Sequence, residues 1–193
     1  MDRRTFCLTG AAALGAAGHA TAQTATAGTG AGYQLPEEFH PRKVRIRGVG
    51  PGEVHVVPAE FALYWTLPDG QAIRYAVGIG RPGLYESGTF FVGAKKEWPS
   101  WTPTPAMIER EPHIYKKWED GMPGGPGNPL GARALYLFEP GRGDTFLRIH
   151  GTSDPSGIGR QVSNGCARLI NDHAIHLYNQ VPMNTRVVLH PKV

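Results

Sequence analysis

Short runs of β-forming residues, separated by glycine- and proline-rich turns, constrain the fold of this chain more than any other feature. The 193 residues include 26 glycines and 17 prolines. Between these turns, β-branched and aromatic residues alternate with polar ones, which is typical of strands. The predicted strands lie at residues 43–47, 54–57, 61–66, 71–79, 89–93, 134–138, 145–150 and 185–189. The pattern predicts a mostly β domain in which residues 61–66 and 71–79 form a hairpin and residues 185–189 close the sheet.

A few short helices complete this prediction. Thr104 can cap a helix with Pro105 at its first position, and Pro112 should stop it. Asn171 or Asp172 can cap a second helix, whose apolar residues recur at helical spacing up to residue 181. Between the two, residues 121–131 hold five glycines and three prolines. This segment either borders a cleft or is a plain surface loop.

The beginning of the chain has the features of an export signal. Arg3 and Arg4 precede an apolar run, and Ala20-Thr21-Ala22 suits a signal peptidase. We therefore expect a signal peptide at 1–22, twin-arginine-like or of the general secretory type, and hence an exported, periplasmic protein of the bacterial envelope. Residues 23–51 are predicted to be a flexible tether and an N-terminal arm, and 52–193 the domain. No later segment approaches the ~20 apolar residues of a transmembrane helix.

Charge and cysteine usage narrow the function further. The formal net charge is +4, a mild excess that suits an anionic polymer but is common in other proteins. No basic run with interleaved aromatic residues suggests a nucleic-acid partner. Of the two cysteines, Cys7 lies in the predicted signal, so Cys166 remains without a disulfide partner. In an exported protein, a lone thiol is better explained by chemistry than by packing.

His150 and Cys166 lie close together in the sequence and suggest nucleophilic chemistry. A cysteine reacts as thiolate, and a neighbouring imidazole lowers its pKa while serving as general acid or base. Gly151 and Gly165 let the backbone turn tightly, and amides near Gly165 and Cys166 could face an oxyanion. The alternative is a small buried cysteine beside a structural histidine. No cofactor is implied.

Several motifs together resemble the YkuD-type catalytic domain of the L,D-transpeptidases. The resemblance covers roughly residues 52–190. Its motifs are His150-Gly151-Thr152, Ser163-Asn164-Gly165-Cys166-Ala167-Arg168, residues 93–99, 101–103 and 125–137, and Leu177-Tyr178. It implies a single β-sandwich or barrel domain that takes peptidoglycan stem peptides, and we expect a monomer. A cysteine at a cleft mouth would take the acyl group of a tetrapeptide's third residue, release D-alanine and pass the acyl group to an amine.

The resemblance also assigns roles to single residues. Cys166 is the expected nucleophile and His150 the base, and the backbone carbonyl of Ser163 should orient the imidazole. Gly165 offers an oxyanion amide with Cys166. The expected substrate-binding residues are Arg168, near a substrate carboxylate or the loop backbone, and Gly151, Thr152 and Asn164. Asn164 stands where many members have a second histidine, so a proton shuttle or substrate contact there is left open.

Other interpretations concern the reaction and the remaining residues. The same acyl-enzyme would serve an L,D-carboxypeptidase or hydrolase, and a non-catalytic peptidoglycan-binding module or a redox-sensing thiol are more remote possibilities. His173 and His176 share a helix face without a third ligand, so exposed side chains and no metal are expected. Trp98 and Trp101 are expected to pack in the core rather than stack on glycans. The resemblance and the thiol chemistry together imply acylation by carbapenems.

Overall fold

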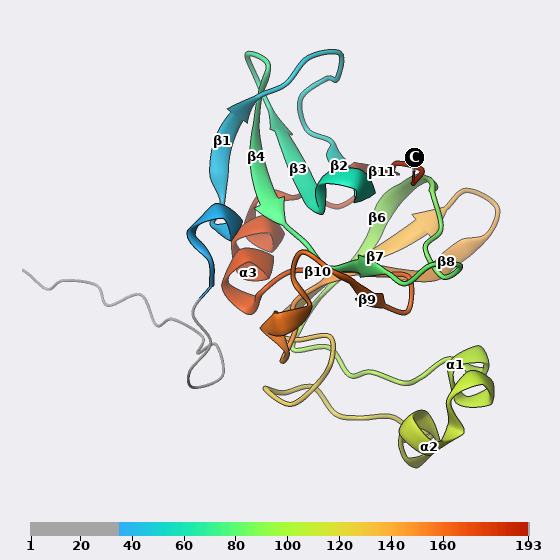
Figure 1. The fold of residues 1–193 in the computed structure, drawn as a ribbon. Coiled ribbons are helices and arrows are strands. Elements are labelled where there is room, and N and C mark those ends of the chain that lie inside the picture. The colour runs from blue at the N-terminus through green and yellow to red at the C-terminus, as the bar shows by residue number, and fades with distance from the viewer. Residues whose placement is uncertain (1–34, 193) are drawn as a thin grey trace, which may run out of the picture.

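The computed structural model describes residues 35–192, so the predicted signal, Cys7 and most of the tether lie outside the described residues. The fold is mostly β, which confirms the prediction (Figure 1). A nine-stranded sheet has the order β1-β4-β3-β2-β11-β6-β7-β8-β10, and β5 pairs with β9 separately. The strands are β1 Arg42–Arg45, β2 Val54–Val57, β3 Ala62–Leu67, β4 Gln71–Ala76, β5 Ile79–Gly80, β6 Gly88–Glu97, β7 Arg133–Glu139, β8 Gly143–His150, β9 Gln161–Ser163, β10 Ala167–Arg168 and β11 Arg186–Leu189.

The helices are few and short. They are α1 Pro105–Arg110, α2 Pro112–Tyr115 and α3 Asn171–Gln180, with 3-10 turns η1 Glu37–Phe39, η2 Pro58–Glu60, η3 Lys116–Trp118 and η4 Pro155–Gly157. Thr104 caps α1 as predicted, because its side chain accepts from the Met107 amide. Pro112 begins α2 instead of ending helical structure, since proline fits a first helical position as well as a stop.

The core joins apolar residues of the large sheet with those of α3, which packs against β7 and β8. Leu63, Tyr75 and Leu137 from three strands and Leu177 from α3 are at most 1 % exposed. Each such side chain contributes about 1.5–3 kcal/mol when removed from water. The apolar runs recognised in the sequence therefore form one large core cluster, and Ala76, Ile158 and Ile170 form a second, smaller one.

Three strands differ from their predicted form. The C-terminal strand β11 lies in the middle of the sheet, parallel to β2 and antiparallel to β6, and does not close it. β6 continues to Glu97 past the predicted end at Gly93, where the register shifts and the Phe138 ring occupies the place of a Cβ. The predicted strand 71–79 is split, because β4 ends at Ala76 and β5 turns to pair with β9.

Residues 98–131, which we call the cleft arm, connect β6 to β7 and differ from the rest of the domain. The arm carries α1 and α2 and projects away from the sheet (Figure 1). No residue from 104 to 127 is buried. Trp98 is 39 % exposed, so the prediction that it packs in the core is wrong. Between residues 104 and 127 the arm is therefore held by partly exposed contacts, whereas its two ends, for example at Leu130, are buried.

Candidate active site

Two neighbouring strands bring His150 and Cys166 together. β8 ends at His150, and β10 runs parallel to it with Arg168 opposite His150. Cys166 immediately precedes β10, so the intervening segment returns the thiol to the end of β8. Both side chains line a cleft of about 570 Å³. The sheet supplies one side of this cleft and the cleft arm the other, including Trp101, Thr104, Met107, Tyr115 and Leu130.

His150 is held as a neutral base. The residue is 3 % exposed, and its Nδ1 lies 2.5 Å from the carbonyl oxygen of Gly151. Burial, followed by the positive charge of Arg168, lowers the His150 pKa to about 3. A neutral ring whose Nδ1–H donates to a carbonyl leaves the lone pair on Nε2. The ring can therefore accept a proton at Nε2.

Cys166 is half-buried and is the one free cysteine in residues 35–192. Burial raises the pKa of its thiol, against the opposing effects of the Arg148 amide and the guanidinium groups of Arg148 and Arg168. In the resting cleft the thiol is therefore protonated and the imidazole neutral. This corrects the expectation that the imidazole by itself lowers the resting thiol pKa, because a buried histidine that stays neutral provides no positive charge.

Ser163 and Gly165 shape the loop before the thiol. The Ser163 hydroxyl donates to the Cys166 carbonyl at 2.6 Å and accepts from the Gly165 amide at 3.3 Å. The Ser163 carbonyl accepts from the Arg81 amide at 2.9 Å, so the imidazole contact expected of it is made by Gly151 instead. Gly165 has φ 119°, and a Cβ there would lie 2.9 Å from the Leu84 carbonyl. Only glycine fits this turn.

Gly151 and Thr152 support the site from behind. The backbone of Gly151 is not left-handed, so its φ does not require glycine. Glycine is required because a Cβ at this position would collide with the Asn171 side chain. That side chain accepts a hydrogen bond from the Ala132 amide at 2.8 Å. Asn171 is thus a packing residue and not the side-chain cap predicted for α3. The Thr152 hydroxyl is bonded to the backbone of Asp154. Neither residue lines the cleft, so the structure does not support their expected substrate contacts.

The two arginines that line the cleft differ in whether an acidic side chain neutralises their charge. Arg148 pairs with both oxygens of Asp144 at 2.7 and 2.8 Å and stacks over Tyr136 at 3.9 Å. Arg168 forms no ion pair with the described residues, and its buried Nε has no hydrogen-bond partner among them. A guanidinium left in this state is suited to bind a carboxylate of a ligand.

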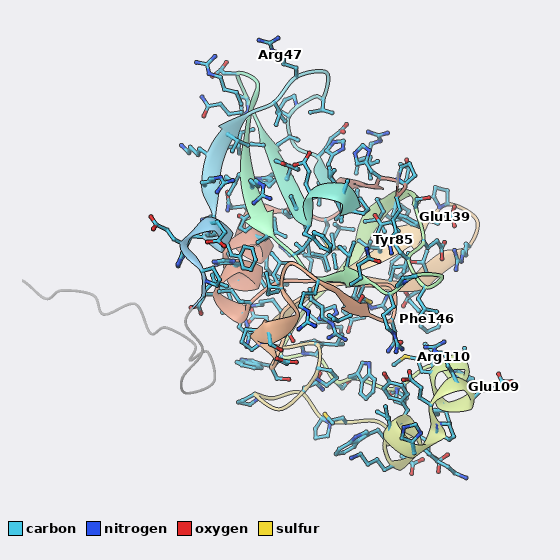
Figure 2. All side chains as sticks on the ribbon, in the orientation of Figure 1. Arg47, Tyr85, Glu109, Arg110, Glu139 and Phe146 are labelled. Atoms are coloured by element: carbon cyan, nitrogen blue, oxygen red, sulfur yellow. The ribbon has the colours of Figure 1, made fainter. Side chains whose placement is uncertain are left out.

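The cleft is completed by Asn164, Trp101 and Phe146, of which only Phe146 lies outside the sequence motifs. Asn164 bonds to Arg81, Arg110 and Tyr115. Trp101 lies edge-on to Tyr115 in the arm wall and does not pack in the core, contrary to the prediction. Phe146, 69 % exposed with φ 62°, stands at the rim (Figure 2). The bulge in the β7–β8 pairing near Phe146 depends on long-range contacts and leaves no local sequence signal.

The remaining histidines do not form a metal site within residues 35–192. His173 is 7 % exposed, so the expectation of an exposed side chain is wrong for it. Burial lowers the His173 pKa to about 4. His176 is exposed, as expected, and its ring bonds to the Tyr75 hydroxyl at 2.7 Å. In the same residues, no helix is long and apolar enough to cross a membrane.

Comparisons with known proteins show which family the sequence matches. Residues 51–189 match the family model described as the L,D-transpeptidase catalytic domain. The probable L,D-transpeptidase ErfK/SrfK of Escherichia coli is 38 % identical over 132 residues, which is 67 % of this chain and 41 % of that protein. The chain thus spans about two fifths of that relative's length.

Solved structures show the same fold. One from Brucella melitensis, named a probable carnitine operon oxidoreductase, is 42 % identical with TM-score 0.56 and covers 82 % of this chain and 96 % of its own. A mutant L,D-transpeptidase of Enterococcus faecium has TM-score 0.55 at 15 % identity over 74 % of this chain and 50 % of its own, a likeness of fold alone. Because the family model covers most of the sequence and its cysteine and histidine meet in one cleft, this chain belongs to the L,D-transpeptidase catalytic-domain family.

Proposed function

We propose that the protein is a cysteine acyltransferase that acts on the tetrapeptide stems of peptidoglycan. It cleaves the bond between the L-centre of the third residue and D-alanine, and transfers the acyl group to an amine. The observation that carries this proposal is the presence of His150 and Cys166 in the same cleft, where the imidazole is neutral. The family supports the reaction type. The export signal expected from the sequence would bring the enzyme to the periplasm and so to this substrate.

The reaction begins with proton transfer. Nε2 of His150 takes the thiol proton while Sγ of Cys166 bonds to the carbonyl carbon of the stem peptide. The tetrahedral intermediate collapses, His150 gives its proton to the leaving amine, and D-alanine departs. A thioester on Cys166 remains. An acceptor amine then attacks the thioester, loses its proton to His150, and the thiol is regenerated.

Backbone amides and Arg168 assist these steps. The Gly165 amide already donates to Ser163, whereas no described hydrogen bond uses the Cys166 amide. The Cys166 amide is therefore the principal oxyanion donor in this proposal. Arg168 binds a carboxylate of the stem, because its charge is not neutralised by any acidic side chain of the described residues. Positive charge from Arg148 and Arg168 also stabilises the thiolate as it forms.

Mass spectrometry of the products tests the proposal. The protein is incubated with tetrapeptide stems, with and without an amine acceptor. We expect release of D-alanine and, with acceptor, a joined product; Cys166→Ala should form neither. Tripeptide alone under both conditions would instead establish an L,D-carboxypeptidase. Unchanged tetrapeptide that remains bound would contradict catalysis and establish a binding module.

A further inference from the structure

Asn164 lies where two distant parts of the chain leave the same small sheet. β5 and β9 are parallel, with Gly80 opposite Ser163. The next residue of each strand is therefore Arg81 or Asn164, and both emerge at the same end. The Arg81 amide donates to the Ser163 carbonyl at 2.9 Å, which fixes the two segments together. The sheet thus presents Arg81 and Asn164 side by side to the cleft arm.

The amide of Asn164 is occupied by protein groups. Its Oδ1 accepts from Arg81 Nη2 at 2.7 Å and from Arg110 Nη2 at 2.9 Å. Its Nδ2 donates to the Tyr115 hydroxyl at 2.8 Å. Two cationic donors around one atom identify that atom as the oxygen. Asn164 therefore joins α1 and α2 to the loop of Cys166 and leaves little capacity for the substrate contact expected from the sequence.

Glu111 completes the connection. It lies between α1 and α2 and accepts from Arg81 Nη1 at 3.3 Å and Nη2 at 2.7 Å. Nε of Arg110 lies 3.7 Å from the same carboxylate. Arg81 holds the Glu111 pKa below its usual range. One carboxylate thus binds two guanidinium groups that both also donate to Asn164. We call Arg81, Arg110, Glu111, Tyr115 and Asn164 the clasp.

We propose that the clasp holds the cleft arm as a movable wall of the active site, and that Asn164 is a positioning residue. The arm has no buried residue between 104 and 127, so its attachment there depends on these polar contacts. Opening the clasp would move Tyr115 and the other wall residues of α1 and α2 away from Cys166. If the proposed function holds, opening and closing of the clasp controls the access of water and amine to the thioester; the inference rests on that function.

Limited proteolysis tests the clasp independently of activity. Lys116 and Lys117 lie exposed in η3 and are targets for trypsin once the arm opens. Asn164→Ala and Glu111→Gln should accelerate cleavage there about 5- to 30-fold, as the loss of charge-assisted hydrogen bonds increases the open population. Raising the salt concentration should accelerate cleavage more in the unmodified protein than in Glu111→Gln, because the ion pair is screened.

Two matched variants make the result specific. Glu109→Gln removes the same charge from α1, but Glu109 is exposed, is directed away from the sheet (Figure 2) and has no ion pair with the described residues. It should be cleaved like the unmodified protein. Asn164→Asp retains the acceptor between the two arginines and should be cleaved no faster. If Asn164→Ala and Glu111→Gln are cleaved at the rate of Glu109→Gln, the clasp is refuted.

Product analysis then separates the clasp from the reaction. Asn164→Ala and Glu111→Gln should raise the ratio of hydrolysed to transferred product several-fold, while Cys166 still becomes acylated. An unchanged ratio in variants with accelerated cleavage would refute control of water access. If the unmodified protein shows neither transfer nor hydrolysis, the proposed function fails, and the cleavage rates alone still decide whether the clasp exists.

Discussion

The sheet and the cleft arm hold their positions by different means. Leu137 in β7 is completely buried, whereas Ile114 in α2 is 42 % exposed. The sheet is stabilised by apolar burial, which is non-directional and strong in sum. The arm is attached through the partly exposed ion pair of Arg81 with Glu111 and through the hydrogen bonds of Asn164, and partly exposed polar contacts of this kind are individually weak. The difference separates two requirements of acyl transfer: the nucleophile and base stay fixed, while one wall can move for substrate and product.

The largest expected effect is on chemistry at the sheet side of the cleft. His150→Ala and Cys166→Ala should each lower the transfer rate by about three orders of magnitude or more, because both residues act in one device. Asn164→Ala, which affects the arm side, should be far milder. Steady-state rates with a tetrapeptide donor measure this. Equal losses in the asparagine and histidine variants would mean that the two walls are not functionally distinct.

The next effect concerns stability. Leu137→Ala should lower the free energy of unfolding by about 2–5 kcal/mol, since it leaves a cavity in the core. Ile114→Ala in the arm should change it by less than about 0.5 kcal/mol. Denaturant unfolding of both variants gives the comparison directly. A cost above about 2 kcal/mol for Ile114→Ala would show that the arm is packed as firmly as the sheet.

A further effect on stability, of similar size, should follow from pH. The pKa values of His150 and His173 are lowered from 6.5 to about 3 and about 4 in the folded protein. The unfolded chain therefore binds more protons as the pH falls below 6.5, and stability decreases by up to about 1.4 kcal/mol per pH unit for each histidine. Stability measured from pH 7 to pH 5 checks this direction.

His173→Gln should reduce the slope of unfolding free energy against pH by up to the contribution of one proton, about 1.4 kcal/mol per pH unit. This holds whatever the substitution does to stability at neutral pH. The matched control is His113→Gln, which changes an exposed residue of the arm. An identical slope in the two variants would contradict the assignment of the pH dependence to buried histidines of the domain body.

Local pattern was enough to predict much of the fold. Alternating residues 54–57 form β2, and Thr104 caps α1, because both depend on neighbours in the sequence. The central place of β11 was not predictable from its own residues, since Val187 pairs with Val54 and Phe90 far along the chain. Pro112 was ambiguous because proline both ends and begins helices.

The candidate site, like the fold, was predictable from the sequence only where it depends on local residues. His150 and Cys166 are visible in one short motif, and the structure brings them into one cleft. The partners of Asn164 are not visible, because Arg81, Arg110 and Tyr115 reach it from distant segments. The imidazole partner was assigned to Ser163 by resemblance, whereas the local backbone places Gly151 there.

The most direct test of the central claim is covalent capture of the thiol. The account predicts that a carbapenem acylates Cys166, because its strained carbonyl meets the nucleophile, the base and the oxyanion amide in the same arrangement as the peptide. Intact-protein mass spectrometry after brief exposure should show one added drug mass, absent in Cys166→Ser. An unmodified mass for the folded protein would contradict the claim that Cys166 is an accessible nucleophile.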